Sequence, residues 1–317
     1  MSLEPAVWHI VFAEPFDPAC VERMRSIGAV TVLEECDEPS LKHAVATCDA
    51  LLVRSRAEVT RGVLESATRL RVIGRAGVGL ENIDLEAARE RGVTVVHTPY
   101  AATEAVADLT VGLILDLLRK VTASDTMIRR RRFEEAREQA CSREMSELTL
   151  GIVGLGRIGR AVARRCYHGF GMRVLYNDLV APGWLDFVAT AVTKDELYAQ
   201  ADVLSLHVPL TDQTRRLMDA TALSKVRRGA FLINTSRGGV VDSTALAQAL
   251  HTGALGGAAL DVFEPEPPGV DDPLLLGPHT LLTPHIGART YRGMERMNAV
   301  VEDVLRVLRG QPPHFAA

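Results

Sequence analysis

Short apolar runs alternate with amphipathic segments along the first hundred residues of the chain. Short apolar runs are typical of buried strands, and apolar residues that recur every three or four positions indicate helices with one buried face. The apolar runs lie near residues 7–12, 29–33, 50–53, 71–74 and 93–96, and the helical patterns near 17–27, 40–47, 60–67 and 84–91. This alternation predicts a small α/β domain with a parallel sheet.

The pattern changes at Thr103, where a long helical pattern extends to about Arg132. A second series of apolar runs opens at Thr149, and a last amphipathic helix is predicted from about Tyr291 to Arg309. The later runs of this series lie near residues 171–176, 203–207, 230–234, 256–260 and 280–282. We therefore expect an α/β protein with two doubly wound parallel sheets.

A Gly-x-Gly-x-x-Gly turn follows the first strand of the second series. Gly154 permits a tight turn, Gly156 lets a pyrophosphate approach the backbone, and Gly159 lets the next helix pack against the strand. That helix is predicted to begin at Arg157 and Ile158, so its N-terminus offers N–H groups and a positive dipole end to phosphates. With a strand before it and a helix after it, the turn predicts a dinucleotide site.

The choice of dinucleotide depends on an acid at the end of the next strand. Asp178 lies where a carboxylate accepts both ribose hydroxyls of NAD. The following residues 179–182 contain no Arg or Lys, whereas an NADP site needs cations for the 2′-phosphate. We therefore predict NAD as the cofactor.

Three later strands are each followed by a group that could take part in proton transfer or anion binding. Arg237 follows the run near 230–234, an acidic segment follows the next run, and His285 follows the run near 280–282. Arginine can hold a carboxylate or ketone oxygen through two N–H donors, and histidine can exchange the hydroxyl proton. A carboxylate can orient the imidazole and favour its protonated form. Each residue alone is more often structural, but together they predict a 2-hydroxyacid dehydrogenase site.

The overall charge argues against two classes of partner. The net charge of −4 over 317 residues gives no general attraction to nucleic acid or to an anionic membrane surface. No apolar run approaches the length that crosses a bilayer. We therefore expect no nucleic acid and no membrane as partner, only a small-molecule substrate.

The cysteines and the first residues indicate the compartment. The five cysteines are scattered and form no Cys-x-x-Cys pair, which argues against disulfides and against a zinc site, so no metal is expected. The first residues include Glu4 and lack the basic stretch of a signal peptide. These features predict a cytoplasmic protein.

Taken together, these motifs resemble those of the D-isomer-specific 2-hydroxyacid dehydrogenases over nearly the whole chain. The matching segments are Gly154–Gly159, His207–Leu210 with Thr214, Asn234–Gly239, Ala258–Pro267 and Pro284–Ala288. The resemblance implies that Arg237, Glu266 and His285 are catalytic. It selects Glu266 rather than Glu264, because the family's acid directly precedes the proline pair.

The resemblance also implies the architecture and the cofactor contacts. Residues 99–286 would form a Rossmann NAD-binding domain inserted into a flavodoxin-like substrate domain made of residues 1–98 plus 287–317. The long helix near 103–120 would support a homodimer. The further cofactor-binding residues implied are Pro209, Thr214, Thr235, Ser236, Asp261, Gly287 and His207, the last lying near the cofactor and not acting as the base.

Within the family, the first half looks most like the 3-phosphoglycerate dehydrogenases, in the segments Leu52–Ser55 and Gly74–Gly79. This implies 3-phosphoglycerate as substrate and a place in serine biosynthesis, with glyoxylate or hydroxypyruvate reduction as the alternative. Arg54 and Ser55 would bind the substrate, unless Arg54 forms only a surface ion pair. The backbone at Gly77, Val78 and Gly79 could hold the substrate carboxylate, because glycines leave N–H groups exposed.

Some segments depart from the family pattern. Ser146–Leu148 replaces the usual turn before the glycine motif, and Glu135 stands where the family has tryptophan. The cluster Arg129–Arg132 is expected at a solvated helix end, although it or Arg137 could reach a substrate phosphate. A nicotinamide-sensing corepressor shares this fold and can keep the three groups, so a binding protein is a second hypothesis. A formate dehydrogenase would pair the histidine with an amide, whereas this chain has the carboxylate of Glu266, which argues against that activity.

Overall fold

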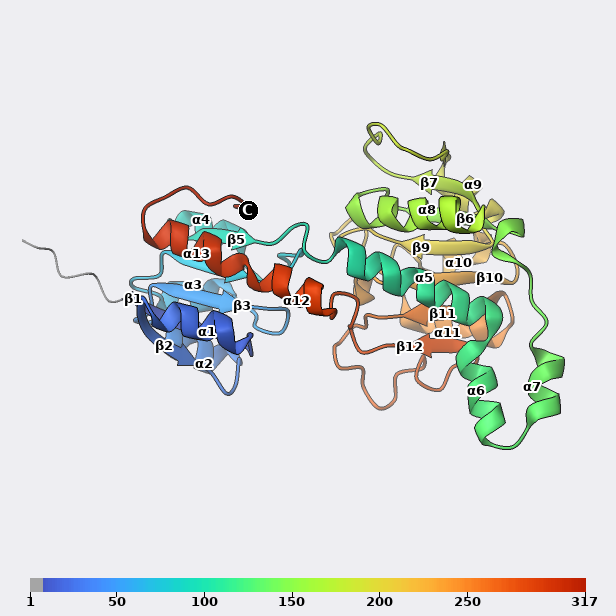
Figure 1. Ribbon diagram of the computed structural model, residues 1–317, viewed down its shortest axis with the longest axis horizontal. Coiled ribbons are helices and arrows are strands. Elements are labelled where there is room, and N and C mark those ends of the chain that lie inside the picture. Colours follow the sequence, from blue (N-terminus) through green and yellow to red (C-terminus); the bar gives the residue numbers. More distant parts are fainter. Residues whose placement is uncertain (1–7) are drawn as a thin grey trace, which may run out of the picture. The chain divides into compact units, whose positions relative to one another are not determined.

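The computed structural model describes residues 8–317, so Glu4 and the first residue of the expected strand 7–12 lie outside the described part (Figure 1). The chain divides into two compact units. Unit 1 contains the described residues up to Ala102 together with Arg289–Ala317, and unit 2 is Thr103–Ala288. The divisions therefore fall slightly later than the 98/99 and 286/287 positions expected from the sequence.

Unit 1 is a five-stranded parallel sheet with the order β2-β1-β3-β4-β5. This is the strand order of flavodoxin-like folds. Its strands are β1 (Trp8–Phe12), β2 (Gly28–Val32), β3 (Ala50–Val53), β4 (Val72–Arg75) and β5 (Thr94–His97). Its helices are α1 (Pro18–Arg25), α2 (Glu38–Val45), α3 (Arg61–Ser66), α4 (Leu85–Glu90), α12 (Tyr291–Asn298) and α13 (Val300–Leu308).

The first four helices of unit 1 begin where a capping side chain precedes an apolar stripe. Asp17, Asp37, Thr60 and Asp84 each accept a hydrogen bond from a backbone N–H in the first turn of α1, α2, α3 and α4. Such caps satisfy donors that the helix itself leaves unpaired. The strands between them are fully buried at positions such as Leu51, and for this reason they read as continuous apolar runs in the sequence.

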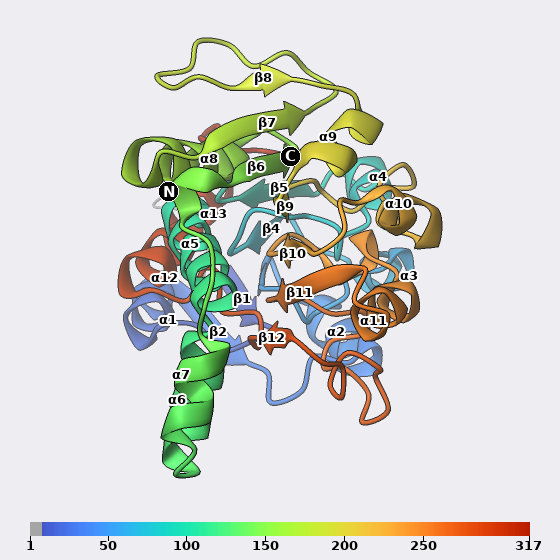
Figure 2. The same cartoon turned by 90° about the vertical axis from the view of Figure 1, so that its right-hand side faces the viewer.

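Unit 2 is a seven-stranded parallel sheet with the order β12-β11-β10-β9-β6-β7-β8, a Rossmann arrangement (Figure 2). Its strands are β6 (Thr149–Val153), β7 (Arg173–Asn177), β8 (Thr190–Ala191), β9 (Val203–Leu206), β10 (Ala230–Asn234), β11 (Leu255–Leu260) and β12 (Thr280–Leu282). Its helices are α5 (Thr103–Arg119), α6 (Val121–Arg129), α7 (Phe133–Gln139), α8 (Arg157–Phe170), α9 (Lys194–Gln200), α10 (Ala220–Lys225) and α11 (Ser243–His251), with 3-10 turns at Met145–Glu147 and Gly238–Val240. The expected fold class is confirmed.

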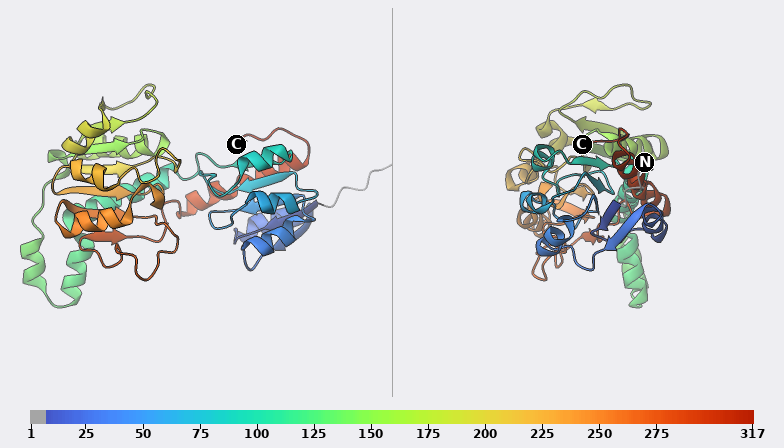
Figure 3. Two further views of the ribbon diagram at one scale, coloured as in Figure 1. Left: turned by 180° about the vertical axis from the view of Figure 1, so that it is seen from behind. Right: turned by 90° about the vertical axis from the view of Figure 1, so that its left-hand side faces the viewer.

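The helical pattern expected from 103 to 132 is divided in the structure: α5 corresponds to the helix expected near 103–120, and a second helix, α6, follows it. Lys120 adopts a left-handed backbone conformation with φ 53°, which ends α5 and starts α6 in a new direction. α6 and α7 lie side by side as a two-helix arm that extends away from the sheet of unit 2 (Figures 1 and 3). The expected helix 291–309 is likewise divided, because α12 ends at Asn298 and α13 begins at Val300.

Three further observations concern membrane spans, metal sites and the cysteines. Within residues 8–317, no helix is both long enough and apolar enough to span a membrane. Over the same residues, no group of three or more His, Cys, Asp or Glu side chains is arranged to hold a metal ion. All five cysteines are free thiols.

Candidate functional site

The glycine turn after β6 is shaped by close backbone contacts. Gly154 has a φ of 89°, and a Cβ there would lie 2.6 Å from the carbonyl oxygen of His207. A Cβ on Gly159 would lie 2.1 Å from the carbonyl oxygen of Gly154. Any larger residue would therefore push β9 or α8 away from the turn. The turn lies between β6 and β9, where the strand order reverses and where open α/β sheets bind ligands.

Gly156 has a different environment. A Cβ at this position would meet nothing within 4 Å, so no clash inside the protein requires a glycine there. Gly156 is also the N-cap of α8, and no side chain caps this helix end. Arg157 and Ile158 are the first two residues of the helix. Open space before an uncapped N-terminus is what a bound phosphate requires, so this turn fits the pyrophosphate of a dinucleotide.

Asp178, directly after β7, is tied to the same turn. Its Oδ2 accepts a hydrogen bond from the N–H of Leu155 at 2.6 Å, and its Oδ1 accepts one from Val180 at 2.9 Å. A carboxylate offers about four acceptor positions, so both oxygens retain capacity for ribose hydroxyls. The side chains of Leu179 and Val180, which follow, are 91% and 74% exposed and uncharged.

The segment after β9 carries three of the expected cofactor residues. Burial lowers the pKa of His207 to about 3, and its Nε2 lies 2.8 Å from the hydroxyl of Ser205. The ring is therefore neutral at physiological pH, as expected for a residue that is not the proton donor. Further along, the Thr214 hydroxyl donates to the carbonyl oxygen of Pro209 at 2.6 Å, so these two residues shape one turn.

The turn after β10 is organised by Asn234, to which the sequence analysis assigned no role. Its Oδ1 accepts from the N–H and the hydroxyl of Ser236, at 3.0 and 2.7 Å, and its Nδ2 donates to the carbonyl oxygen of Arg237 at 2.8 Å. Asparagine at the end of a strand is typical of such side-chain turns, which is the signal that could have identified it. Thr235 is buried, with its hydroxyl 3.0 Å from that of Thr110 in α5.

Arg237 is held close to the acid of the next loop. Its Nη1 donates to the carbonyl oxygen of Ser236 at 2.6 Å. Burial lowers the pKa of Arg237, and the negative charge of Glu266 opposes that effect. The charges of Arg237 and Glu266 therefore interact within unit 2.

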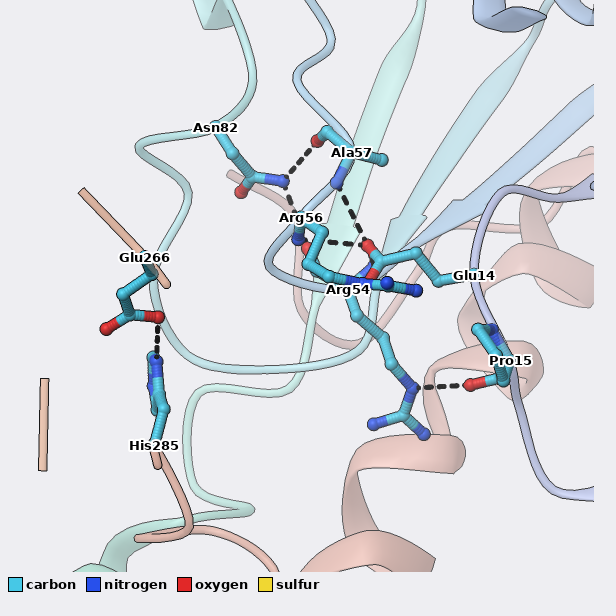
Figure 4. Close-up of polar contacts among 8 residues, drawn as sticks. All are labelled: Glu14, Pro15, Arg54, Arg56, Ala57, Asn82, Glu266 and His285. Carbon is cyan, nitrogen blue, oxygen red and sulfur yellow. Dashed lines mark hydrogen bonds and ion pairs between the residues drawn. The ribbon is translucent and has the colours of Figure 1, made fainter. Parts of the chain in front are cut away.

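Glu266 and His285 form the central pair of the site. His285 Nδ1 lies 2.8 Å from Glu266 Oε2 (Figure 4). Glu266 Oε1 accepts from the N–H of Phe263 at 3.1 Å. Burial alone would raise the pKa of Glu266, but the hydrogen bonds and charges of His285, with help from Arg237, hold it below its ordinary value. The carboxylate is therefore ionised, so Nδ1 carries the proton and Nε2 faces away from Glu266. Glu264 instead pairs with Arg215 at 2.8 Å.

The loop that carries His285 is fixed by Asp261. His285 has a φ of 51°, a conformation that is unfavourable for a residue with a Cβ. The buried Asp261 carboxylate accepts from the Thr283 hydroxyl at 2.6 Å and from the N–H groups of Ile286 and Gly287, both at 2.8 Å. Asp261 thus stabilises the loop on both sides of His285. We expected it to line the cofactor, and the structure gives it this second set of contacts.

Within unit 1, Arg54 has a fixed orientation. Its Nε donates to the carbonyl oxygen of Pro15 at 3.0 Å, and its Nη2 donates to Asn298 Oδ1 at 2.7 Å. The guanidinium also lies over the ring of Phe16, 4.7 Å from its centre. The surface ion pair considered from the sequence is therefore not what holds this side chain. Ser55, the next residue, is exposed.

Two side chains hold the loop that contains Arg54. Glu14 Oε1 accepts hydrogen bonds from the N–H groups of Arg54, Arg56 and Ala57, at 2.8, 3.1 and 3.1 Å (Figure 4). Asn82 Nδ2 donates to the carbonyl oxygens of Arg54 and Ala57, at 3.0 and 2.7 Å. Neither contact has a local signal in the sequence, because the partners are far apart in the chain.

The turn Gly77–Gly79 also lies in unit 1. Gly77 has a φ of 155°, and a Cβ there would lie 1.4 Å from Arg75 Nη1. Val78 and Gly79 are partly accessible, and within residues 8–317 their N–H groups donate to no other protein group. They therefore fit the expected carboxylate-binding role. Arg75 is buried and donates to the carbonyl oxygen of Ala76 at 3.0 Å.

The basic cluster of the arm is partly paired within the arm itself. Arg129 Nε lies 2.7 Å from Asp125 Oδ2, and Arg132 forms an ion pair with Glu135. All four arginines of the cluster 129–132, and Arg137, are exposed. These contacts fit the solvated helix end favoured from the sequence.

The chain is similar in sequence to known dehydrogenases and reductases. Residues 111–287 match the family described as "D-isomer specific 2-hydroxyacid dehydrogenase, NAD binding domain". The chain is 37% identical to a D-3-phosphoglycerate dehydrogenase of Methanocaldococcus jannaschii over 95% of its own length and 58% of that protein. It is 34% identical to a hydroxypyruvate reductase of Thermotoga maritima, covering 93% of this chain and 96% of that protein.

A solved structure is similar to this chain over nearly its whole length. The crystal structure of the TT0316 protein from Thermus thermophilus superposes with a TM-score of 0.89 and 37% identity, covering 98% of this chain and 99% of that one. The chain spans about half the length of the first phosphoglycerate dehydrogenases that it matches, 58% and 49% of two of them.

Proposed function

The chain belongs to the D-isomer-specific 2-hydroxyacid dehydrogenase family, and we propose that it interconverts a D-2-hydroxy acid and its 2-oxo acid with NAD(H). The observation that carries this proposal is the 2.8 Å hydrogen bond between Glu266 and His285, next to Arg237. These groups follow β10, β11 and β12, at the edge of the sheet where ligands of such folds bind.

His285 is the proposed acid and base. Its Nδ1–H is held by the ionised Glu266, so Nε2 is the atom available to the substrate. In oxidation, Nε2 takes the proton of the substrate hydroxyl as the hydride leaves the carbon. In reduction, the protonated ring returns that proton to the new alkoxide oxygen. Glu266 stabilises the protonated ring through its charge.

Arg237 is the proposed ligand of the substrate's carboxylate and carbonyl oxygens. Its planar guanidinium can bind two oxygens at once, which orients the carbon that exchanges the hydride. The turn held by Asn234 and Ser236 fixes its backbone. This fixation reduces the entropy lost when substrate binds.

NAD(H) fits the turn after β6. Gly154, Gly156 and Gly159 with the N-terminus of α8 would hold the pyrophosphate, and Asp178 the ribose. When bound, the nicotinamide accepts or supplies the hydride. The other residues proposed to line the cofactor are Arg157, Ile158, His207, Pro209, Thr214, Thr235, Ser236, Asp261 and Gly287.

For the substrate, we propose 3-phosphoglycerate and its oxo acid, with Arg54, Ser55 and the Gly77–Gly79 turn as ligands in unit 1. The supporting observations are the oriented guanidinium of Arg54 and the N–H groups of Val78 and Gly79. Glyoxylate or hydroxypyruvate is the second candidate. It is favoured by the Thermotoga maritima hydroxypyruvate reductase, whose length this chain covers almost completely.

The test is a substrate panel followed by NADH absorbance. Phosphohydroxypyruvate, hydroxypyruvate, glyoxylate and pyruvate are each reduced under the same conditions, and kcat/KM is compared. A higher value for phosphohydroxypyruvate supports the first candidate, and a higher value for hydroxypyruvate or glyoxylate replaces it with the second. Tight NADH binding without turnover of any acid would contradict the dehydrogenase assignment and favour a sensor.

We further propose a cytoplasmic homodimer in which the arm of α6 and α7 contacts a second copy. Within residues 8–317, α6 has no buried side chain. Val121, Ile128 and Phe133 of the arm are 57%, 50% and 57% exposed. Exposed apolar side chains on a projecting element are typical of a protein interface.

A further inference from the structure

Arg54 is held entirely by uncharged groups. The contacts of its guanidinium within residues 8–317 are the carbonyl oxygen of Pro15, the amide oxygen of Asn298, the ring of Phe16 and the sulfur of Met294, which lies 3.9 Å from Nη1. An arginine has five N–H donors, and two suffice for the two oxygen acceptors. The side chain is thus oriented while its charge is not neutralised by a contacting acid.

Glu14 attracts the charge of Arg54, but its carboxylate contacts the backbone N–H of Arg54 and not the guanidinium. Glu14 is 3% exposed, and its Oε1 accepts hydrogen bonds from the backbone N–H groups of residues 54, 56 and 57. Its Oε2 accepts one from Arg56 Nε at 3.3 Å. Burial lowers the pKa of Arg54; the charge of Glu14 opposes this effect and the charge of Arg289 adds to it. The positive charges of Arg54 and Arg289 therefore repel each other, which favours an anion as their ligand.

Asn298 orients the guanidinium of Arg54 and is itself uncharged. It lies at the buried C-terminal end of α12, 5% exposed, and its Oδ1 is 2.7 Å from Arg54 Nη2. An aspartate would fill the same space and accept the same hydrogen bond. It would also add a negative charge in a poorly solvated place, where an ion pair with Arg54 would compete with any anionic ligand.

We propose that Asn298 is a specificity-determining positioning residue: it orients Arg54 toward an anionic group of the substrate and, because it is uncharged, leaves the charge of Arg54 available to that group. This inference rests on the proposed function in one respect, that Arg54 is a substrate ligand. It adds a residue of α12 that acts through Arg54 and does not touch the substrate.

The experiment compares Asn298→Asp with Arg54→Ala and with Ala299→Asp. Ala299 is exposed and adjacent, so its variant carries the same change of net charge without contact to Arg54. KM and kcat are measured for the 2-oxo acid that the wild-type enzyme reduces best, with the KM for NADH and the thermal unfolding midpoint. Asn298→Asp should raise the KM for the oxo acid about tenfold, the loss of one charge-assisted hydrogen bond.

The other readouts separate this role from a structural one. In Asn298→Asp, kcat and the KM for NADH should stay within about twofold of wild type. The unfolding midpoint should stay near that of wild type, because the aspartate accepts the same hydrogen bond from Arg54. Ala299→Asp should match wild type in kcat, in the KM for the oxo acid, in the KM for NADH and in the unfolding midpoint. Asn298→Ala, which removes the acceptor without adding charge, should raise the KM by a smaller factor than Asn298→Asp.

The outcomes distinguish the role of Asn298 from that of Arg54. If Arg54→Ala raises the KM for the oxo acid and neither Asn298 variant does, Asn298 has no such role, although the assignment of Arg54 stands. If Arg54→Ala leaves the KM of every acid unchanged, Arg54 is not a substrate ligand, and both fail. If the KM for the oxo acid rises more in Asn298→Ala than in Asn298→Asp, the orientation of Arg54 alone matters, which contradicts the proposed role of charge.

Discussion

His285 has one ring nitrogen engaged by Glu266 at 2.8 Å and the other available. Replacing it by alanine removes the proposed proton carrier and leaves the glycine turn after β6 intact. We expect kcat to fall by about 10²–10⁴-fold, the usual contribution of general acid–base catalysis. NADH affinity, measured by fluorescence titration, should change little. Turnover within tenfold of wild type would contradict the assignment.

Glu266 affects the reaction through the charge of its carboxylate. The amide of Glu266→Gln can still contact the ring but no longer stabilises its protonated form. In the reductive direction, the alkaline limb of the kcat/KM profile should therefore move to lower pH. The profile is recorded from pH 5 to 10 beside Glu264→Gln, which serves as the matched control because Glu264 pairs with Arg215. Identical profiles for the two variants would exclude the proposed coupling.

His207 should make stability depend on pH. Its folded pKa, about 3, lies below the ordinary value near 6.5, so the unfolded chain binds its proton first as pH falls. Stability from the neutral ring is complete above about pH 6.5 and is lost progressively toward pH 3, by about 1 kcal/mol between pH 6 and 5. Urea unfolding at pH 7, 6 and 5 should show a shallower decline for His207→Gln than for wild type. Parallel declines would refute the shift.

Among the structural elements, the turn after β7 decides cofactor preference. Asp178 is fixed against the glycine turn, and Leu179, 91% exposed, provides no cation. A 2′-phosphate beside this carboxylate should lower kcat/KM with NADPH by about 100-fold relative to NADH, or two steps of 1.4 kcal/mol. Leu179→Arg should narrow the difference, whereas Trp184→Arg, at another exposed position, should not. Equal efficiency with both cofactors in the wild-type enzyme would overturn this prediction.

The break between α5 and α6 illustrates a limit of reading elements from sequence. The residues from Thr103 to Arg129 keep a helical spacing, and nothing in them resembles a usual helix end. Lys120 takes a left-handed conformation that glycine or asparagine normally supplies. Its Nζ donates to the carbonyl oxygen of Gln139, at 2.6 Å, so the end of α7 contributes to the break. Contacts between elements, and not local preference, set this boundary.

At the scale of the whole molecule, the arm of α6 and α7 predicts an assembly. A single chain has a mass of 34.4 kDa, and light scattering should report about twice this value if the homodimer forms. Replacing Ile128 and Phe133, both at least half exposed, by glutamate should shift the mass toward that of one chain. The matched control replaces the exposed apolar residue Val270 by glutamate. A monomeric wild-type protein would disprove the dimer.

Much of the fold was predictable because most of its buried strands appear in the sequence as short apolar runs. Among the strands in residues 8–317, eleven lie within two residues of expected apolar runs, as with β5 at Thr94–His97 against 93–96. The short β8 was missed because Thr190–Ala191 is exposed and leaves no apolar run. The family and the NAD-binding domain are confirmed by the match over residues 111–287. The residue roles within the site are proposals, which the variants described for His285, Glu266 and Asp178 test.

By itself, the sequence determined the two α/β units, the glycine turn and the strand ends that carry Arg237 and His285, because burial and turn preferences act over a few neighbouring residues. Only the tertiary structure shows which side chains hold the Arg54 loop and orient Arg54. Glu14 reaches a loop 40 residues away, and Asn298 orients Arg54 across 244 residues. The hydrogen bond of Glu266 to His285, and the pairing of Glu264 with Arg215, agree with the choice of Glu266 that the family motif implied, but the contacts themselves come only from the structure. Such contacts depend on how distant segments meet, and no local pattern of residues records that.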